Sequence, residues 1–154
     1  IQNVEGSIDI ENRSGVTHGE FLVGPLSIRQ AEGEIDLRWI EGDIRIKSVS
    51  STVRIQQVSG AIDLESDDGD VYVRTELDSP RDYFVQTGSG AIVFSVPQRS
   101  AGALRMETKS GVIATELPVA VQSMTDNYLE GVFGRGGIRV ELSSSSGDVT
   151  LAAY

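Results

Sequence analysis

The sequence of 154 residues contains no cysteine and only one histidine. Without cysteine, the chain cannot form a disulfide framework or a thiolate metal site. The single histidine, His18, cannot supply a pair of histidine ligands to a metal, and it argues against a Ser-His nucleophile system. We expect His18 to be an exposed polar residue. From these absences we predict no catalytic residue and no cofactor.

Long apolar runs and runs of basic residues are also missing. The longest apolar stretches are too short to cross a bilayer, and no secretion signal opens the sequence. The 13 basic residues are outnumbered by 23 acidic ones, which gives a formal net charge of −10. Nucleic-acid binders draw most of their affinity from Lys and Arg on phosphates. We therefore expect a protein or glycan partner, no nucleic acid, and no direct membrane insertion of this segment.

What the sequence does contain is a nine-residue repeat. Stepping by nine residues from Gly6, seven of eight positions hold glycine and one holds serine. These markers are Gly6, Gly15, Gly24, Gly33, Gly42, Ser51, Gly60 and Gly69. Glycine suits such positions because a tight corner between strands often needs a positive φ angle. A short repeat of this kind predicts a solenoid.

Each unit alternates between apolar and polar residues. The second and fourth residues after a marker are apolar in every unit except the one with Thr17 and Gly19. The apolar pairs are Ile8 and Ile10, Leu26 and Ile28, Ile35 and Leu37, Ile44 and Ile46, Val53 and Ile55, Ile62 and Leu64, and Val71 and Val73. This period of two predicts one short strand per unit with one face inward. We also expect the apolar seventh residues to turn inward at the corners: Leu22, Ala31, Ile40, Val49 and Val58.

The second half of the sequence keeps the strands but lengthens the corners. After Gly69, steps of twelve alternate with steps of nine, and a much longer step then leads to Gly136. The markers of this half are Arg81, Gly90, Gly102, Gly111, Gly136 and Gly147. The longest step contains a weaker half-unit around Leu129, beside a loop. No window combines a helical period with helix caps, so we predict little or no helix.

Charge decides how many units form one coil, because nine residues cannot enclose a core. With three units per coil, Asp9, Asp36 and Asp63 would stack about 4.8 Å apart, which like charges disfavour. With two units, Arg45 stacks on Asp63 instead. We therefore predict an all-β fold, a two-sided, flattened parallel β-solenoid that coils right-handed with about 18 to about 21 residues per coil.

A two-unit coil predicts two inward columns of side chains. One contains Leu26, Ile44, Ile62, Tyr83 and Leu104, and the opposite one contains Ile35, Val53, Val71, Ile92 and Ile113. We expect one domain over residues 1–154, with regular units in 1–77 and longer coils with loops in 78–154. Ile1 and Val4 fall late in a unit, so we expect the sequence to begin inside a coil and to have lost upstream residues.

Several segments resemble the bacterial, adhesin-like DUF4097 family, whose members look like strings of "sGdI.l" and "l.v.T.sGdI.l" units. The segments are "SGAIDL" (59–64), "TGSGAIVF" (87–94), "ALRMETKSGVIATEL" (103–117) and "GRGGIRVELSSSSGDVTL" (134–151). The resemblance covers nearly the whole chain and rests on turns and strands. It implies a β-solenoid of an extracytoplasmic, envelope-associated or surface-exposed protein, and it transfers no functional residue.

Few residues form constellations that could carry chemistry. Asp67, Asp68 and Asp70 surround one turn, and their oxygens make a weak Ca²⁺ candidate. A solvated corner explains them better, because the recurring Asp of calcium-binding β-rolls is absent. The carboxylates of Asp36 and Asp63 could act together in a glycosidase only across a cleft. We expect both to be surface residues.

Outward aromatic rings are the remaining candidates for a binding surface, because they stack on sugars or on partner side chains. The candidates are Phe21, Trp39, Tyr72 and Tyr128. Trp39 precedes the inward Ile40 and should therefore face outward or lie along the corner, half-buried beside a neighbouring coil.

Three functions fit these observations. The first is a non-enzymatic, adhesin-like envelope or surface module that presents its β-surface for binding or assembly. The second is a scaffold that polymerises end to end in the manner of bactofilins, through self-association of the solenoid ends. The third is a polysaccharide-active β-helix enzyme. We expect the first, because the motifs account for their residues as turns and strands.

Overall fold

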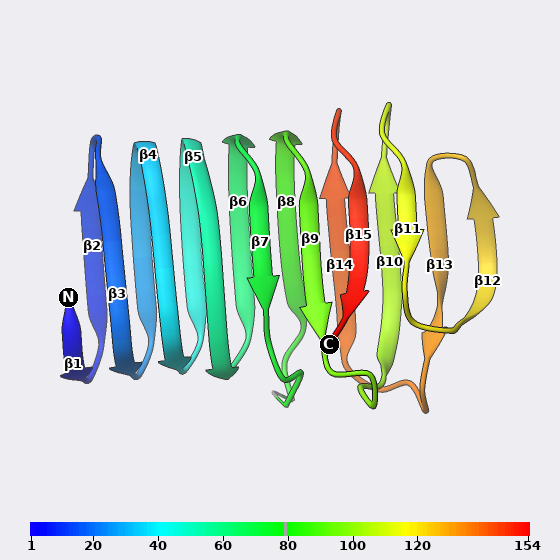
Figure 1. The fold of residues 1–154 in the computed structure, drawn as a ribbon, viewed down its shortest axis with the longest axis horizontal. Helices are drawn as coiled ribbons and strands as arrows, with labels where there is room; N and C mark the ends of the chain where they lie inside the picture. Colours follow the sequence, from blue (N-terminus) through cyan, green and yellow to red (C-terminus); the bar gives the residue numbers. More distant parts are fainter. Residues whose placement is uncertain (79) are drawn as a thin grey trace.

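The computed structural model describes residues 1–78 and 80–154, which form β-strands and no helix (Figure 1). Consequently, no helix within these two ranges is long and apolar enough to cross a membrane. The strands are β1 (Gln2–Glu5), β2 (Ile8–Asn12), β3 (Val16–Val23), β4 (Leu26–Glu41), β5 (Ile44–Ser59), β6 (Ile62–Asp68), β7 (Val71–Arg74), β8 (Tyr83–Ser89), β9 (Ile92–Val96), β10 (Gly102–Thr108), β11 (Ile113–Thr115), β12 (Val119–Thr125), β13 (Tyr128–Phe133), β14 (Arg139–Ser144) and β15 (Val149–Ala153).

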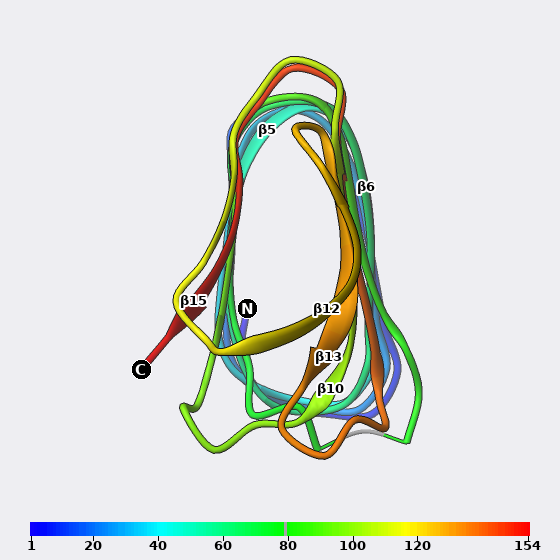
Figure 2. The ribbon, with the colours of Figure 1, turned by 90° about the vertical axis from the view of Figure 1, so that its right-hand side faces the viewer.

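The strands stack into a flattened, two-sided solenoid (Figures 1 and 2). β4 and β5 each run along one side, turn a corner and return along the other side. We call the side built from β2, β6, β8, β14, β10 and the first halves of β4 and β5 face 1. The side built from β3, β7, β9, β15, β11 and the second halves of β4 and β5 is face 2.

The pairing register confirms a coil of two units. Leu26 pairs with Ile44, and Ile44 pairs with Ile62, so each strand skips the next unit and pairs with the one after it. On the opposite side Ile35 pairs with Val53, which excludes the three-unit coil in which it would pair with Ile62. The coil becomes longer between β6 and β8, where Asp63 pairs with Phe84, as the lengthened corners of the second half predict.

The order of strands in the second half differs from the order expected from the chain. β14 lies between β8 and β10, and β15 lies between β9 and β11 (Figure 1). The members of both predicted columns share one register, but each column contains one further residue. Val140 lies between Tyr83 and Leu104 in the first column, and Val149 lies between Ile92 and Ile113 in the opposite one. Alternation sets which residues face inward, but it carries no information about which strand is the neighbour.

The half-unit around Leu129 is one strand of an antiparallel hairpin. β13 pairs antiparallel with β10, and β12 pairs antiparallel with β13. Leu129 and Phe133 are buried, and the hairpin lies across the end of the solenoid (Figure 2). A strand is present around Leu129, but it runs antiparallel to its neighbours and is therefore not the expected half-unit of a parallel solenoid. The hairpin instead covers core that the last coil would expose.

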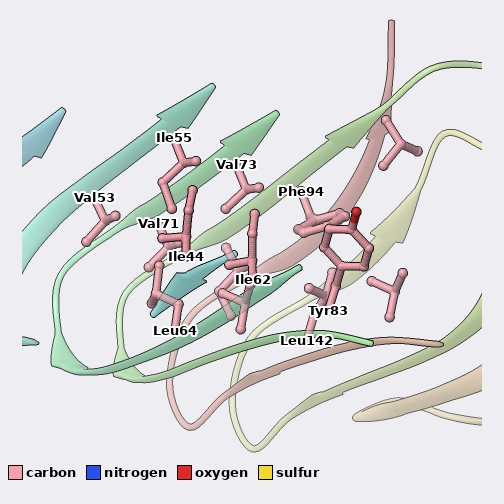
Figure 3. Close-up of a cluster of buried hydrophobic side chains, with 14 of the residues drawn as sticks. Ile44, Val53, Ile55, Ile62, Leu64, Val71, Val73, Tyr83, Phe94 and Leu142 are labelled. Atoms are coloured by element: carbon pink, nitrogen blue, oxygen red, sulfur yellow. The ribbon is translucent and has the colours of Figure 1, made fainter. Parts of the chain in front are cut away.

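The core is a column of apolar side chains between the two faces (Figure 3). Ile44, Ile62 and Val71 are fully buried or nearly so. The rings of Tyr83 and Phe94 meet edge to face, with centroids 6.0 Å apart and planes at 76°. Burying a side chain of this size stabilises the fold by about 1.5–3 kcal/mol.

One corner of the solenoid is polar on its inside in successive coils. At the corner that leads from face 1 to face 2, the inward position holds a hydroxyl or amide, and we call it the polar corner. Its inward residues are Gln30, Ser48, Ser66, Thr87, Ser144 and Thr108. The seventh residues there do not turn inward as predicted: Val49 is 54% exposed and Ala31 is partly exposed. At the opposite corner Leu22 and Ile40 are buried, as predicted, whereas Val58 is only partly buried. The polar Gln57 and Thr75 are the buried residues of the next two coils there.

Backbone carbonyls explain the polar corner. Thr87 Oγ1 donates to the Ser89 carbonyl at 3.0 Å, and Ser144 Oγ donates to the Gly90 carbonyl at 3.0 Å. The chain turns between the two faces here, and these hydroxyls give its carbonyls a side-chain donor. The Ser89 carbonyl also accepts from the Gly69 amide at 2.9 Å, so the Thr87 hydroxyl is its second donor.

Candidate binding surface

Two carboxylates of the acidic turn at residues 67–70 accept hydrogen bonds from a neighbouring coil. Asp68 Oδ1 accepts a hydrogen bond from Ser89 Oγ at 2.6 Å, and Asp70 Oδ1 accepts one from the Ala91 amide at 2.9 Å. Asp67 is exposed. Within residues 1–78 and 80–154, no group of three or more His, Cys, Asp or Glu is arranged to hold a metal ion.

Asp70 has counterparts in other coils. Asp43 Oδ1 accepts from the Ala61 amide at 3.0 Å, and Asp148 Oδ1 accepts from the Val112 amide at 2.8 Å. Each aspartate follows a marker glycine and caps the equivalent turn of a neighbouring coil. The "Gly-Asp" of the repeat is therefore a structural pair, and its carboxylate serves the fold.

The carboxylates of Asp36 and Asp63 lie on opposite faces. Asp36 is on face 2, where its Oδ2 is 3.5 Å from His18 Nδ1. Asp63 is on face 1, where its Oδ2 is 3.3 Å from Arg45 Nε. The solenoid core separates the two carboxylates, so they cannot act on one substrate bond. His18 is partly exposed and beside a carboxylate.

Phe21 and Trp39 form an exposed aromatic pair on the corner opposite the polar one, which we call the aromatic corner. The ring centroids are 6.4 Å apart and the planes differ by 4°. The residues are 50% and 46% exposed. Both lie at the same register, between the pairs Glu20–Arg38 and Leu22–Ile40. The expectation that Trp39 faces outward along a corner agrees with this position.

Both aromatic residues have a left-handed backbone conformation. The φ angle is 54° at Phe21 and 56° at Trp39. For a residue with a Cβ atom this conformation costs roughly 1–2 kcal/mol, and glycine avoids that cost. Burial does not explain the choice of residue, because about half of each side chain is exposed. The same conformation occurs at Asn3, which lies opposite Phe21 in the preceding coil, and at Leu77, so the strain belongs to the corner, and the exposed rings are what distinguish Phe21 and Trp39.

Tyr72 and Tyr128 do not join this pair. Tyr72 is 39% exposed on face 2, and the Arg54 guanidinium lies 5.6 Å from its ring centroid. Tyr128 belongs to the terminal hairpin and donates to Glu130 Oε2 at 2.6 Å. That hydrogen bond to a carboxylate raises the pKa of the Tyr128 hydroxyl above its usual value. The four candidate rings therefore lie in three separate places.

Sequence reasoning missed an arginine-lined groove on face 2. The groove has a volume of about 360 Å³ and is lined by Arg38, Arg54, Arg74 and Tyr72, among others. Arg38, Gln56 and Arg74 succeed one another in one outward row, and Arg54 lies in the next row, between Asp36 and Tyr72. We call this feature the arginine groove. Writing the sequence with one two-unit coil per row would have aligned these side chains.

A second groove, of about 570 Å³, lies on face 1. Its lining includes Asp43, Arg45, Asp63, Arg81 and Phe84. Two ion pairs lie in it, Arg81 with Asp43 and Arg45 with Asp63. Asp9 and Asp82 also line this groove, so it is acidic, with the exposed phenyl ring of Phe84 among the charged groups.

Comparisons with known proteins place the chain in a family. A crystal structure titled as a "putative cell adhesion protein" from Clostridium sporogenes aligns over 97% of this chain and 93% of that chain. The sequence identity is 9% and the TM-score is 0.49. No curated protein matches the sequence. The profile of the Toastrack DUF4097 family matches residues 40–152, a range that begins just after the aromatic pair. The chain therefore belongs to the Toastrack DUF4097 family.

Proposed function

We propose that the chain is a non-enzymatic, adhesin-like binding module of the bacterial cell envelope or surface, acting outside the cytoplasm. The observation that carries the proposal is the exposed aromatic pair of Phe21 and Trp39 in strained backbone conformations. The resemblance of the repeat to envelope-associated solenoids supports the location.

The solenoid suits binding because it holds the rings rigidly. Phe21 and Trp39 extend from consecutive coils whose flanking residues are in parallel register. A fixed ring loses little conformational entropy when a ligand arrives, so more of the stacking free energy appears as affinity. Aromatic residues held in this way are typical of the residues that dominate binding interfaces.

Binding also fits the carboxylates better than catalysis does. Asp36 and Asp63 lie on different faces, and Asp43, Asp70 and Asp148 cap turns. Glycoside hydrolysis needs two carboxylates that flank one bond. The alternative of a polysaccharide-active enzyme therefore finds little support in these positions.

Glycine variants of the aromatic pair test the proposal without harming the fold. Trp39→Gly and Phe21→Gly remove the rings and relieve the left-handed strain at the same time. We expect each to weaken binding to arrayed envelope glycans and proteins about tenfold or more. Phe84→Ala is the matched control, because Phe84 is 43% exposed but lies on face 1. If both glycine variants bind as tightly as the parent chain, the aromatic corner is not the binding site.

Self-association is a second candidate, favoured by the asymmetry of the two ends. β1 pairs with β3, β2 pairs with β4, and no further strand of the described ranges pairs with either. Ile8 and Ile10 are only partly buried there, whereas the hairpin covers the other end. Exposed edges of this kind are templates for pairing with another chain. Light scattering that grows with concentration supports this candidate, and a constant monomer mass contradicts it.

A further inference from the structure

We propose that the arginine groove binds a sparsely charged acidic polysaccharide, one whose carboxylates are separated by neutral sugar rings. The inference rests on the proposed binding function and adds the chemical class of the ligand. It depends on Arg38, Arg54, Arg74 and Tyr72, which line one groove of face 2.

The groove concentrates positive charge on an acidic molecule. Three of the 13 basic residues lie within it, although the net charge of the chain is −10. Arg38 and Arg74 flank Gln56 in one outward row, so their Cα atoms are two strand spacings apart, about 9.6 Å. Arg54 lies between them in the neighbouring row. An anion on face 2 therefore meets guanidinium groups from three successive coils.

Each guanidinium keeps donors for a ligand. Arg38 binds Asp36 through two hydrogen bonds of 2.9 and 3.2 Å, and its side chain is 53% exposed. Arg54 pairs with Glu34 and is 50% exposed. Arg74 is exposed, and its guanidinium lies 3.8 Å from the centroid of the Tyr154 ring. Arginine has five N–H donors, and these contacts use only some of them.

The carboxylates between the arginines set the charge density that the groove accepts. Asp36 lies in the groove and Glu34 pairs with Arg54 at its margin. Both repel a polymer that carries a charge on every residue, such as nucleic acid or a polyanionic peptide. Sugar hydroxyls, in contrast, donate hydrogen bonds to carboxylates. A polymer that alternates carboxylates with neutral, hydroxyl-bearing rings therefore satisfies both kinds of side chain.

The spacing and the neighbouring rings also favour a glycan over a peptide. In an extended peptide, side chains on one side recur about every 6.8 Å, which is shorter than the separation of about 9.6 Å between Arg38 and Arg74. Tyr72 lies within the groove, and Trp39 follows Arg38 directly in the chain. Sugar rings stack on such aromatic faces through their C–H groups. The aromatic corner thus begins at the residue next to Arg38 of the groove.

Hyaluronan oligosaccharides are the probe, because they carry one carboxylate per disaccharide. Their binding to the chain is measured by calorimetry beside three other polymers: carboxyl-reduced hyaluronan, polyglutamate and oligothymidylate. We expect hyaluronan to bind, and to bind about tenfold more tightly than its carboxyl-reduced form. Arg38→Gln and Arg74→Gln should each weaken binding about tenfold. Arg29→Gln is the control, since Arg29 is exposed on the same strand β4 but on face 1.

Several results would overturn the proposal. These are absent hyaluronan binding, equal affinity for the carboxyl-reduced polymer, an equal effect of Arg29→Gln, or tighter binding of polyglutamate or oligothymidylate. The variants replace exposed side chains, so circular dichroism should show an unchanged fold. If hyaluronan does not bind while binding to the envelope array still depends on Trp39, the proposed ligand class is wrong and the proposed function stands. If Trp39→Gly changes neither hyaluronan binding nor binding to the envelope array, the proposed function itself is wrong.

Discussion

At the scale of single residues, the left-handed conformation of Trp39 reverses the usual preference between alanine and glycine. In an ordinary strand glycine is less stable than alanine by about 0.5–1 kcal/mol, because it loses more backbone entropy on folding. At Trp39, with a φ angle of 56°, alanine retains the steric penalty and glycine does not. We expect Trp39→Gly to be more stable than Trp39→Ala by about 1 kcal/mol in urea denaturation.

Phe84 provides the comparison for this prediction. It is exposed on strand β8, and its φ angle is not among the positive ones. Here Phe84→Ala should be more stable than Phe84→Gly. The same order of stability at both positions would contradict the argument that the aromatic corner is strained.

A second residue-scale prediction separates the inside of the solenoid from its surface. Ile62 is fully buried and stacks on Ile44, so a carboxylate there has no partner. Ile62→Asp should lower the free energy of unfolding by about 3–5 kcal/mol. Asp63, the next residue, pairs with Arg45 in solvent, and Asp63→Asn should cost less than about 1 kcal/mol. Equal losses in chemical denaturation would mean that the inward and outward positions are reversed.

At the scale of structural elements, the polar corner contains serines with different roles. Ser144 Oγ donates to the Gly90 carbonyl and accepts from the Gly147 amide, each at 3.0 Å. Ser48 Oγ, at the equivalent place in β5, is buried without a hydrogen-bond partner among the described residues. Ser144→Ala should therefore destabilise the chain by about 1–3 kcal/mol. Ser48→Ala should be neutral or slightly stabilising, because it removes an unpaired buried hydroxyl.

Thermal and chemical unfolding of the two alanine variants, compared with the parent chain, checks this prediction. The substitution is the same in both, so side-chain volume does not distinguish them. If Ser48→Ala lowers the free energy of unfolding as much as Ser144→Ala does, the serine hydroxyls stabilise the corner through something other than these hydrogen bonds.

The strands show how far the sequence carries a prediction. Alternation and charge stacking were sufficient to predict the inward positions of Ile44, Ile62 and Val53 and the two-unit coil. The neighbours of β14 could not be predicted, because Val140 has the same phase as Leu104 and either one would fit beside Tyr83. The arginine groove was missed because its residues belong to successive coils and come together only once the coil length is known.

At the scale of the whole molecule, the strand order divides the solenoid into two blocks. From β2 to β9, successive coils stack in chain order, whereas β14 and β15 come from the end of the chain and lie inside the stack (Figure 1). On face 1, β14 is the link between β8 and β10, and β10 in turn carries the hairpin. In repeat architectures each unit depends mainly on its nearest neighbours. The stability of the block that contains β10 and the hairpin should therefore depend on β14, and the stability of the block from β2 to β9 should not.

Val140→Asp tests this division, because Val140 is fully buried between Tyr83 and Leu104. The unpaired carboxylate should disrupt β14, and with it the only strand that joins β10 to β8 among the described residues. Hydrogen exchange followed by mass spectrometry should show lost amide protection in residues 102–144 and retained protection in residues 26–74. Thr150→Asp, at an outward position of β15, the strand that follows β14 in the chain, is the control and should leave both blocks protected. Loss of protection spread evenly over all coils would instead show that the solenoid unfolds as one cooperative unit.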